Sequence, residues 1–359
     1  MTTQGPLPLR ILAVGETRHG TNAHAFIRAF RRSGHSVEVI ADEYYGAPAW
    51  TSRRLKALRR AIQPMLVREG THAIRRAVQD FRPHLLFVFL GSMVTPQAIL
   101  AAQEAGAVAI NFWPDISITA HGKWPQHALP LYDWVFSTKR FGLADMERLL
   151  DVRRASYMPH AFDPETHRPS LLDETDRARY SCDVSFIGTW SPKKEHAIRA
   201  IHDALPDARM RVWGRQWRRA APGLETVVEG RSVWGVEYAK AVGASRINLA
   251  LLSEARGEAS GGDTVTSRSF HIPASGGFML HERTVEAQRF FTEGLDCAMF
   301  GDRRELVAKV RYFLAHAEER VRLATGGRAR VLSDDHSADN RVREIVAKAR
   351  ALLNEKSAG

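Results

Sequence analysis

An arginine at the start of a short predicted helix is the residue of this sequence best suited to binding an anion. Arg268 lies in the segment Asp263–Glu282, where the helix is followed by Gly276-Gly277 and an apolar run. The first N–H groups of a helix lack intrahelical partners and carry the positive end of the helix dipole, and a guanidinium adds a two-pronged donor. The pattern therefore predicts a diphosphate site at the edge of a sheet.

Residues with acid or base chemistry follow apolar runs in the first half of the chain. Asp115 comes shortly after Val108–Phe112, and His19 lies in a glycine-bearing loop behind Leu9–Val14. Either side chain can accept a proton, so both are candidates for a general base. Glu16, in the same loop as His19, is a further candidate, and His121 and His160 are weaker ones.

The elements that hold these residues alternate between strands and helices. The apolar run Leu9–Val14 is followed by a helical segment His24–Ser33 and a second run Val37–Ile40. A second series begins with the strand Asp183–Ile187 and the helix Lys194–Ala204. This alternation predicts two doubly wound, Rossmann-like α/β domains with parallel sheets.

Glycines that directly follow predicted strands mark where a ligand would bind. Gly188-Thr189 follows the strand Asp183–Ile187, and Gly214 follows a strand that ends at Trp213. In doubly wound sheets, ligands bind at the carboxyl ends of the strands. Two such domains that face each other would place these loops along an interdomain cleft.

Changes in composition along the chain divide it into four segments. We expect an N-terminal domain over residues 1–165 and a linker over 166–180, which is rich in proline, charge and turn formers. A second domain is expected over 181–335. Residues 336–359 form a final charged helix, which either stays with the second domain or crosses back to the first.

Bulk composition bounds the class of protein. The 359 residues carry a net charge of +11, but the basic residues are spread along the chain without a nucleic-acid-binding signature, so no nucleic acid partner is expected. Only Cys182 and Cys297 are present, in no metal-ligand spacing. No apolar run is as long as a membrane span, and no signal-peptide core follows the N-terminus. We therefore expect a cytoplasmic protein without a disulfide framework or a cysteine-based zinc site.

A basic segment in the first half leaves two interpretations open. Across Arg53–Met65, Leu55, Leu58, Ile62 and Met65 form one helical stripe, and arginines and a lysine occupy the other positions. The stripe would pack on the core beneath a solvated basic face, or the helix would rest on an anionic membrane at the inner membrane face.

An ordered series of motifs in the second half is more specific than any one of them. This series consists of Asp183–Trp190, Val212–Trp217, Ser245–Leu249, Ser267–Leu280 and His336–Arg341. Two looser matches, Tyr132–Phe136 and Met158–Pro164, lie in the first half. Together, these motifs resemble those of the CgeB-like, spore-protein-type glycosyltransferases, which have the GT-B architecture.

The resemblance implies a C-terminal domain that binds a nucleotide-diphospho-sugar and an N-terminal domain that binds the acceptor. Such enzymes need no metal or other cofactor, and the acceptor would be a glycan, a lipid-linked glycan, a protein or a small molecule. Arg268, beside Ser267, would neutralise the donor diphosphate, with Lys194 or its neighbour Lys193 as a second cation behind the Gly188-Thr189 turn. Trp213-Gly214 would line the pocket for the base or ribose.

The donor motif departs from the family pattern at two positions. Where the family has two glutamates eight positions apart, this chain has Asp263 and His271. Asp263 keeps a carboxylate for sugar hydroxyls, whereas His271 makes one hydrogen bond and cannot grip a diol. The predicted function is therefore a glycosyltransferase. The alternatives are a non-catalytic nucleotide-sugar-binding module and a nucleotide-sugar epimerase on the same scaffold.

Overall fold

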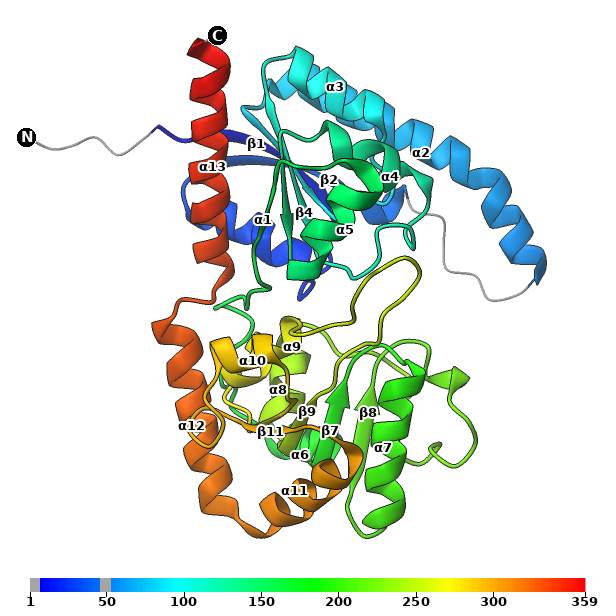
Figure 1. Cartoon of the computed structure of the whole chain (residues 1–359), viewed down its shortest axis with the longest axis vertical. Helices are drawn as coiled ribbons and strands as arrows, with labels where there is room; N and C mark the ends of the chain where they lie inside the picture. Colours follow the sequence, from blue (N-terminus) through cyan, green and yellow to red (C-terminus); the bar gives the residue numbers. More distant parts are fainter. Residues whose placement is uncertain (1–6, 46–52, 359) are drawn as a thin grey trace, which may run out of the picture. The chain divides into compact units, whose positions relative to one another are not determined.

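The computed structural model describes residues 7–45 and 53–358, and for residues 53–60 it describes the backbone only. The described residues form two compact units (Figure 1). The first takes Met1–Pro159, Ala255–Gly261 and Asp339–Gly359, and the second takes His160–Glu254 and Gly262–Ala338. The sequence-based division ended the first domain at residue 165 and gave no sign that Ala255–Gly261 belongs with it.

The first unit is built on a six-stranded parallel sheet in the order β2-β1-β3-β4-β5-β6. All six residues of β4 are buried, as expected for a parallel strand covered by helices on both faces. The strands are β1 (Arg10–Gly15), β2 (Ser36–Ala41), β3 (Leu85–Phe89), β4 (Val108–Trp113), β5 (Trp134–Ser137) and β6 (Ala155–Tyr157).

Helices cover both faces of this sheet. Phe26 of α1 packs against Phe112 of β4 on one face, with 4.7 Å between the ring centres, and Ile74 of α2 belongs to the core of the other face. The last helix is tied to this unit by an ion pair of Arg32 with Asp339, at 2.9 Å. The helices are α1 (Asn22–Arg32), α2 (Arg53–Phe81), α3 (Pro96–Glu104), α4 (Lys123–Ala128), α5 (Arg140–Leu150) and α13 (Ala338–Ala358), with short 3-10 turns at Asp42–Tyr44 and Leu129–Leu131.

The basic segment Arg53–Met65 forms the start of the long helix α2. Met65, which the sequence pattern placed on the apolar stripe, is 55% exposed. The side chains of residues 53–60 lie outside the described residues, so contact with a membrane stays a prediction. Across the helices that the structure describes, none is long and apolar enough to cross a bilayer.

The second unit has a five-stranded parallel sheet in the order β11-β10-β9-β7-β8. The doubly wound, parallel α/β class predicted from the sequence is confirmed for both units. Residues 166–180, predicted as a linker, lie in this unit and include a helix. The strands are β7 (Cys182–Ile187), β8 (Met210–Trp213), β9 (Ser245–Ala250), β10 (Met279–Glu282) and β11 (Ala298–Phe300). The helices are α6 (Glu174–Tyr180), α7 (Pro192–Ala204), α8 (Val236–Gly243), α9 (Ser267–Ala274), α10 (Val285–Phe290), α11 (Arg303–Ala315) and α12 (Ala317–Ser333), with a 3-10 turn at Trp217–Arg219.

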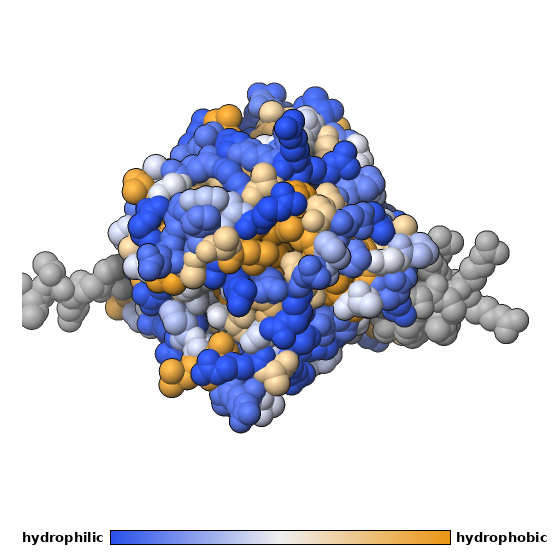
Figure 2. Space-filling model, turned by 90° about the horizontal axis from the view of Figure 1, so that it is seen from below, coloured by the Kyte–Doolittle hydropathy of each residue, from blue (hydrophilic) through white to orange (hydrophobic). Residues whose placement is uncertain are grey.

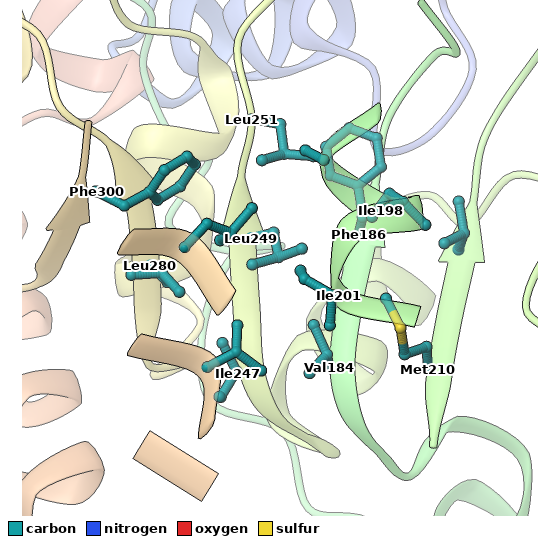
Figure 3. Packing of buried hydrophobic residues seen from close by; sticks show 14 of the residues in the cluster. Val184, Phe186, Ile198, Ile201, Met210, Ile247, Leu249, Leu251, Leu280 and Phe300 are labelled. Carbon is teal, nitrogen blue, oxygen red and sulfur yellow. The ribbon is translucent and has the colours of Figure 1, made fainter. Parts of the chain in front are cut away.

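Side chains that alternate along the strands fill two cores. Figure 3 shows the core in which Phe186 of β7 and Leu249 of β9 pack near Ile198 and Ile201 of α7. The opposite face carries α8 and α9, which contribute Tyr238 and Phe270 among other residues. Each fully buried side chain of this kind contributes roughly 1.5–3 kcal/mol to the stability of the fold.

On the face drawn in Figure 2, hydrophilic residues predominate and surround apolar groups near the centre of the view.

The glycine pair after α9 has a packing role. Gly276 has φ +81°, which suits the residue that ends a helix. A Cβ on Gly277 would lie 2.4 Å from Val242 Cγ1 and 2.8 Å from Asn248 Nδ2. Asn248 is itself fixed, because its Nδ2 donates to Phe278 O at 3.2 Å and its Oδ1 accepts from Ser185 Oγ at 2.9 Å. The neighbours therefore leave no room for a larger residue at position 277.

We predict that Gly277→Ala lowers the free energy of unfolding by about 1–3 kcal/mol, because overpacking forces Val242 and Asn248 to shift. Urea unfolding monitored by circular dichroism measures this change. Gly243→Ala is the matched control. A Cβ on Gly243 meets nothing within 4 Å, so this variant should be as stable as the wild type or more stable. Equal stability of the two variants would contradict the packing role.

Candidate functional site

The topology of the second unit creates a point where neighbouring loops diverge. The chain goes from β7 to β8 on one side, and then to β9 on the other side of β7. Crossovers of opposite direction leave a crevice at the carboxyl ends of the two central strands, and ligands of doubly wound sheets bind there. In this chain those ends are Ile187-Gly188 of β7 and Leu251 after β9.

Arg268, from the first turn of α9, spans these two strand ends. Its Nη2 donates to Leu251 O at 2.7 Å, and its Nη1 lies 3.5 Å from Ile187 O. The guanidinium carbon is 5.2 Å from the centre of the Phe186 ring. A Cβ on Gly188 would come within 2.8 Å of Nη1, so a glycine lets the arginine reach across. The structure thus places Arg268 at the switch point of the sheet.

The guanidinium keeps donor capacity after these bonds. Burial lowers the pKa of Arg268, and the charge of Asp263 opposes that shift, yet arginine stays protonated in proteins. The Nε–H of Arg268 is buried and has no partner within the described residues, and the same holds for the hydroxyl of Tyr238. A buried donor without an acceptor costs about 1–3 kcal/mol. An anion at this position would supply the missing acceptors.

Lys194 lies at the same edge, near the start of α7. Its side chain is 3% exposed, and Nζ donates to Ser253 Oγ at 2.7 Å and to Thr189 O at 3.2 Å. The hydroxyl of Ser191 donates to Glu254 at 2.7 Å, and no side chain caps the first turn of α7. The positive end of this helix therefore adds to the charge of the lysine.

The loop before α9 is fixed by backbone pairing. The Asp263 carboxylate accepts from Ser253 N at 3.2 Å, and Asp263 N donates to Ser253 O at 2.9 Å. Ser267, partly exposed, is the first residue of α9. The structure thus brings Asp263, Ser267, Arg268 and Lys194 to one edge of the second sheet.

The turn after β8 packs directly on the turn after β7. Gly214 has φ +145°, and a Cβ there would lie 1.9 Å from Gly188 O, so only glycine fits. Trp217 Nε1 donates to that same oxygen at 2.9 Å. Trp213 is fully buried beside Tyr180, with 6.4 Å between the ring centres. Because the Trp213 side chain is buried, it has no surface on which a nucleotide base could pack. The structure therefore does not support the prediction that Trp213 lines the pocket for the base or ribose.

His271, predicted as a donor-binding residue in place of the family's second glutamate, lies in the interior. Its ring is stacked on His167 with 3.7 Å between the centres, and Nε2 donates to Ala161 O at 2.9 Å. Burial lowers the pKa of His271 well below the usual value, so the ring is neutral at pH 7. The hydrogen bond to Ala161 and the stacking on His167 give this residue a structural role.

A buried hydrogen-bond chain that the sequence did not reveal holds the start of α9. His281 Nδ1 donates to Glu282 O at 2.6 Å, so Nε2 accepts from Ser269 Oγ at 2.8 Å. Ser269 Oγ in turn accepts from Thr266 N at 3.0 Å, completing the N-cap of the helix. The only sign of this hydrogen-bond chain in the sequence is the spacing of Thr266 and Ser269, with the serine three residues after the threonine. This hydrogen-bond chain fixes Ser269, the residue just after Arg268, to strand β10.

All the candidates for a general base except His160 lie in the first unit. Asp115 Oδ2 is 2.6 Å from His121 Nε2, and 46% of the Asp115 side chain is exposed. His19 is exposed, and its ring centre lies 5.7 Å from that of His24. The structure therefore pairs Asp115 with His121. Of the remaining candidates, Glu16 pairs with Arg18 at 2.9 Å, and His160 is buried in the second unit.

Close to this pair, a carboxylate from Ala255–Gly261 is held by the loop after β4. Glu258 Oε1 accepts from Ile118 N and Thr119 N, both at 2.9 Å, and from Ser117 Oγ at 3.1 Å. Burial alone would raise the pKa of Glu258, but the hydrogen bonds lower it to about 2. Nothing in the sequence pattern indicated this contact.

Comparisons with known proteins identify a related family and solved structures with a similar fold. Residues 193–347 match a family model described as glycosyl transferase-like. No curated protein matches the chain. Among solved structures, a glycosyltransferase from Rickettsia africae is similar with a TM-score of 0.67 and 10% identity, over 96% of this chain and 99% of that one.

Two further solved structures show the same fold. Anabaena HepE in complex with UDP-glucose has a TM-score of 0.60 and 13% identity, over 95% of this chain and 100% of that one. A putative UDP-N-acetylglucosamine 2-epimerase from Listeria monocytogenes has a TM-score of 0.56 and 10% identity, over 97% and 98% of the two chains. The fold is therefore of the GT-B class, as predicted.

We predict that His281 makes stability fall at acidic pH. Burial lowers its pKa from 6.5 to about 4, so between these values the unfolded chain binds a proton and the folded chain does not. The free energy of unfolding should thus decrease as the pH falls from 6.5 to 4. In His281→Gln this decrease should be smaller by roughly 3 kcal/mol.

Chemical unfolding at a series of pH values measures this difference. His271 is unchanged in the variant, so its own contribution cancels in the comparison. His127→Gln, at an exposed position of the first unit, provides the control for replacing a histidine outside the interior. Parallel pH profiles for wild type and His281→Gln would show that the buried imidazole is not responsible.

Proposed function

We propose that this chain is a metal-independent glycosyltransferase that moves a sugar from a nucleotide-diphospho-sugar to an acceptor hydroxyl. The observation that carries the proposal is the position of Arg268 at the switch point, with a buried Nε–H that lacks an acceptor. The match of residues 193–347 to a glycosyl transferase-like family, and the UDP-glucose bound by Anabaena HepE, support this assignment.

In this reaction the acceptor oxygen forms a bond to the anomeric carbon while the bond from that carbon to the diphosphate oxygen breaks. The leaving nucleoside diphosphate gains negative charge, which preorganised cations stabilise as it develops. We assign that role to Arg268, assisted by Lys194 and the positive end of α7. Ser267 and the Gly188-Thr189 turn would contact the same phosphates, and Asp263 would accept from a sugar hydroxyl.

The proton released by the acceptor needs a group to receive it. We assign this role to the first unit, where the Asp115 carboxylate holds His121 at 2.6 Å. A carboxylate that orients an imidazole stabilises its protonated form. His19, exposed in the loop after β1, is the alternative base. The acceptor would be a glycan, a lipid-linked glycan, a protein or a small molecule.

A nucleotide-sugar epimerase is the second candidate function. Its support is the likeness to the putative 2-epimerase from Listeria monocytogenes. An epimerase would alter a nucleotide sugar without any acceptor and would release no free nucleoside diphosphate as its main product. Chromatography of the products therefore separates the two functions.

We predict that Arg268→Ala reduces binding of nucleoside diphosphates by tenfold or more, because a hydrogen bond to a charged group contributes about 1.5–3 kcal/mol. A thermal-shift panel of UDP, GDP, dTDP and ADP first identifies the base, and calorimetry with the best ligand then gives the affinity. Transfer or hydrolysis of the matching nucleotide sugar should fall at least as strongly.

Arg246→Ala provides the matched control. Arg246 lies in β9 of the same unit, with 60% of its side chain exposed in an ion pair with Asp183, so its loss should leave nucleotide affinity unchanged. Arg268→Lys keeps the positive charge but loses the two-pronged donor of the guanidinium. We expect its nucleotide affinity to lie between those of Arg268→Ala and the wild type. Wild-type affinity in Arg268→Ala would overturn the site.

A further inference from the structure

The second unit contains a pocket of about 430 Å³ at the carboxyl ends of β9, β10 and β11. This volume lies within the range of small-molecule sites, about 300–1,000 Å³. None of its lining residues except Lys193 and Lys194 was singled out by the sequence as a ligand contact. The lining consists of Lys193, Lys194, His196 and Ala197 of α7, Leu251 and Leu252 after β9, Glu282 of β10, Phe300 of β11, and Gly301, Asp302 and Arg303 at the start of α11.

This pocket adjoins the Arg268 site through two shared residues. Leu251 lines the pocket, and its carbonyl oxygen accepts from Arg268 Nη2 at 2.7 Å. Lys194 also lines the pocket, while its Nζ is held by Ser253 Oγ at 2.7 Å. A ligand whose phosphates are bound by Arg268 therefore has a neighbouring cavity for the group attached to them.

The polar group best placed for recognition in this pocket is the carboxylate of Glu282. Its Oε2 accepts from Leu252 N at 3.2 Å, and its Oε1 is paired with Lys193. A carboxylate offers about four lone-pair positions, so these two bonds leave acceptor capacity on both oxygens. Two oxygens with spare lone pairs match two hydroxyl groups on adjacent carbons.

The remaining lining is mixed. Leu251, Leu252 and Phe300 form an apolar wall, and the C–H face of a sugar ring packs on such a surface. The basic side chains of the lining are Lys193, which is paired with Glu282, together with Lys194, His196 and Arg303. At the Glu282 carboxylate itself a phosphate would be repelled, whereas hydroxyl groups donate to it.

We propose that this pocket binds a vicinal diol of the donor, with Glu282 accepting from both hydroxyls. The inference rests on the proposed function, because it supposes a nucleotide sugar bound at Arg268. It also assigns the diol contact to a residue other than His271, whose ring is bonded to Ala161. The ribose and the transferred hexose both carry such a diol, and the experiment below distinguishes them.

Calorimetric titration of wild type and Glu282→Gln tests the proposal with UDP and GDP, their 2′-deoxy forms, UDP-glucose and GDP-mannose. If the ribose occupies the pocket, the substitution weakens the ribonucleoside diphosphates about tenfold and removes their advantage over the 2′-deoxy forms. If the hexose occupies it, the substitution weakens the nucleotide sugars and leaves the diphosphates unchanged. Either outcome supports the proposal.

Two further variants protect the test from a trivial result. The glutamine oxygen can still accept from Leu252 N, and thermal unfolding without ligand checks that Glu282→Gln is folded. If it is not, Glu282→Asp replaces it, because this change keeps the charge and withdraws the carboxylate from the diol. Glu225→Gln, at an exposed position of the same unit, should bind every probe as the wild type does.

Unchanged affinities in a folded Glu282→Gln protein, with the wild type binding its nucleotide, would overturn this inference alone. A wild-type protein that binds none of the six probes, and neither dTDP nor ADP in the thermal-shift panel, would contradict the proposed function, and the diol site with it. Since the second result appears in the wild type and the first only in the variant, the two failures are distinguishable.

Discussion

The contact on which the rest of the site depends is the bridge that Arg268 makes between the ends of β7 and β9. By donating to Leu251 O at 2.7 Å, with Nη1 facing Ile187 O, the guanidinium holds its charge at the sheet's switch point. The same geometry favours a glycine at position 188, because a Cβ there would lie 2.7 Å from Phe186 Cζ and 2.8 Å from Nη1. Gly214 is required for a different reason, since a Cβ there would lie 1.9 Å from the backbone oxygen of Gly188. Close packing at the strand ends therefore explains the glycines of two neighbouring turns.

The position of Arg268 is secured by bonds within the fold and needs no ligand to set it. The chain from His281 through Ser269 to Thr266 ties the start of α9 to β10, and Asp263 pairs with Ser253 in the preceding loop. A preorganised cation stabilises developing charge without having to reorient during the reaction. The buried Nε–H that lacks an acceptor is consistent with a site that is completed by an anion.

The sequence predicted the alternating elements and the place of Arg268 at the start of a short helix, because strand and helix periodicity and the glycines after strands are local signals. It could not predict the burial of Trp213 and His271, which depends on side chains distant in sequence, such as Ala161 for His271. The sequence also could not predict that Ala255–Gly261 belongs to the first unit, because Glu258 bonds to residues about 140 positions away. No sequence pattern marked Glu282 as a ligand contact, because a pocket is a property of the assembled sheet.

The central claim is that a nucleoside diphosphate binds at Arg268, and the most direct test observes the Nε–H group itself. The ¹H–¹⁵N resonance of this group is observable by NMR when it is shielded from solvent, and Arg268→Lys identifies it by its disappearance. On titration with the nucleoside diphosphate that the protein binds, this resonance should move downfield as the group gains a phosphate acceptor. Nucleotide binding that leaves the Arg268 Nε–H resonance in place would contradict the account.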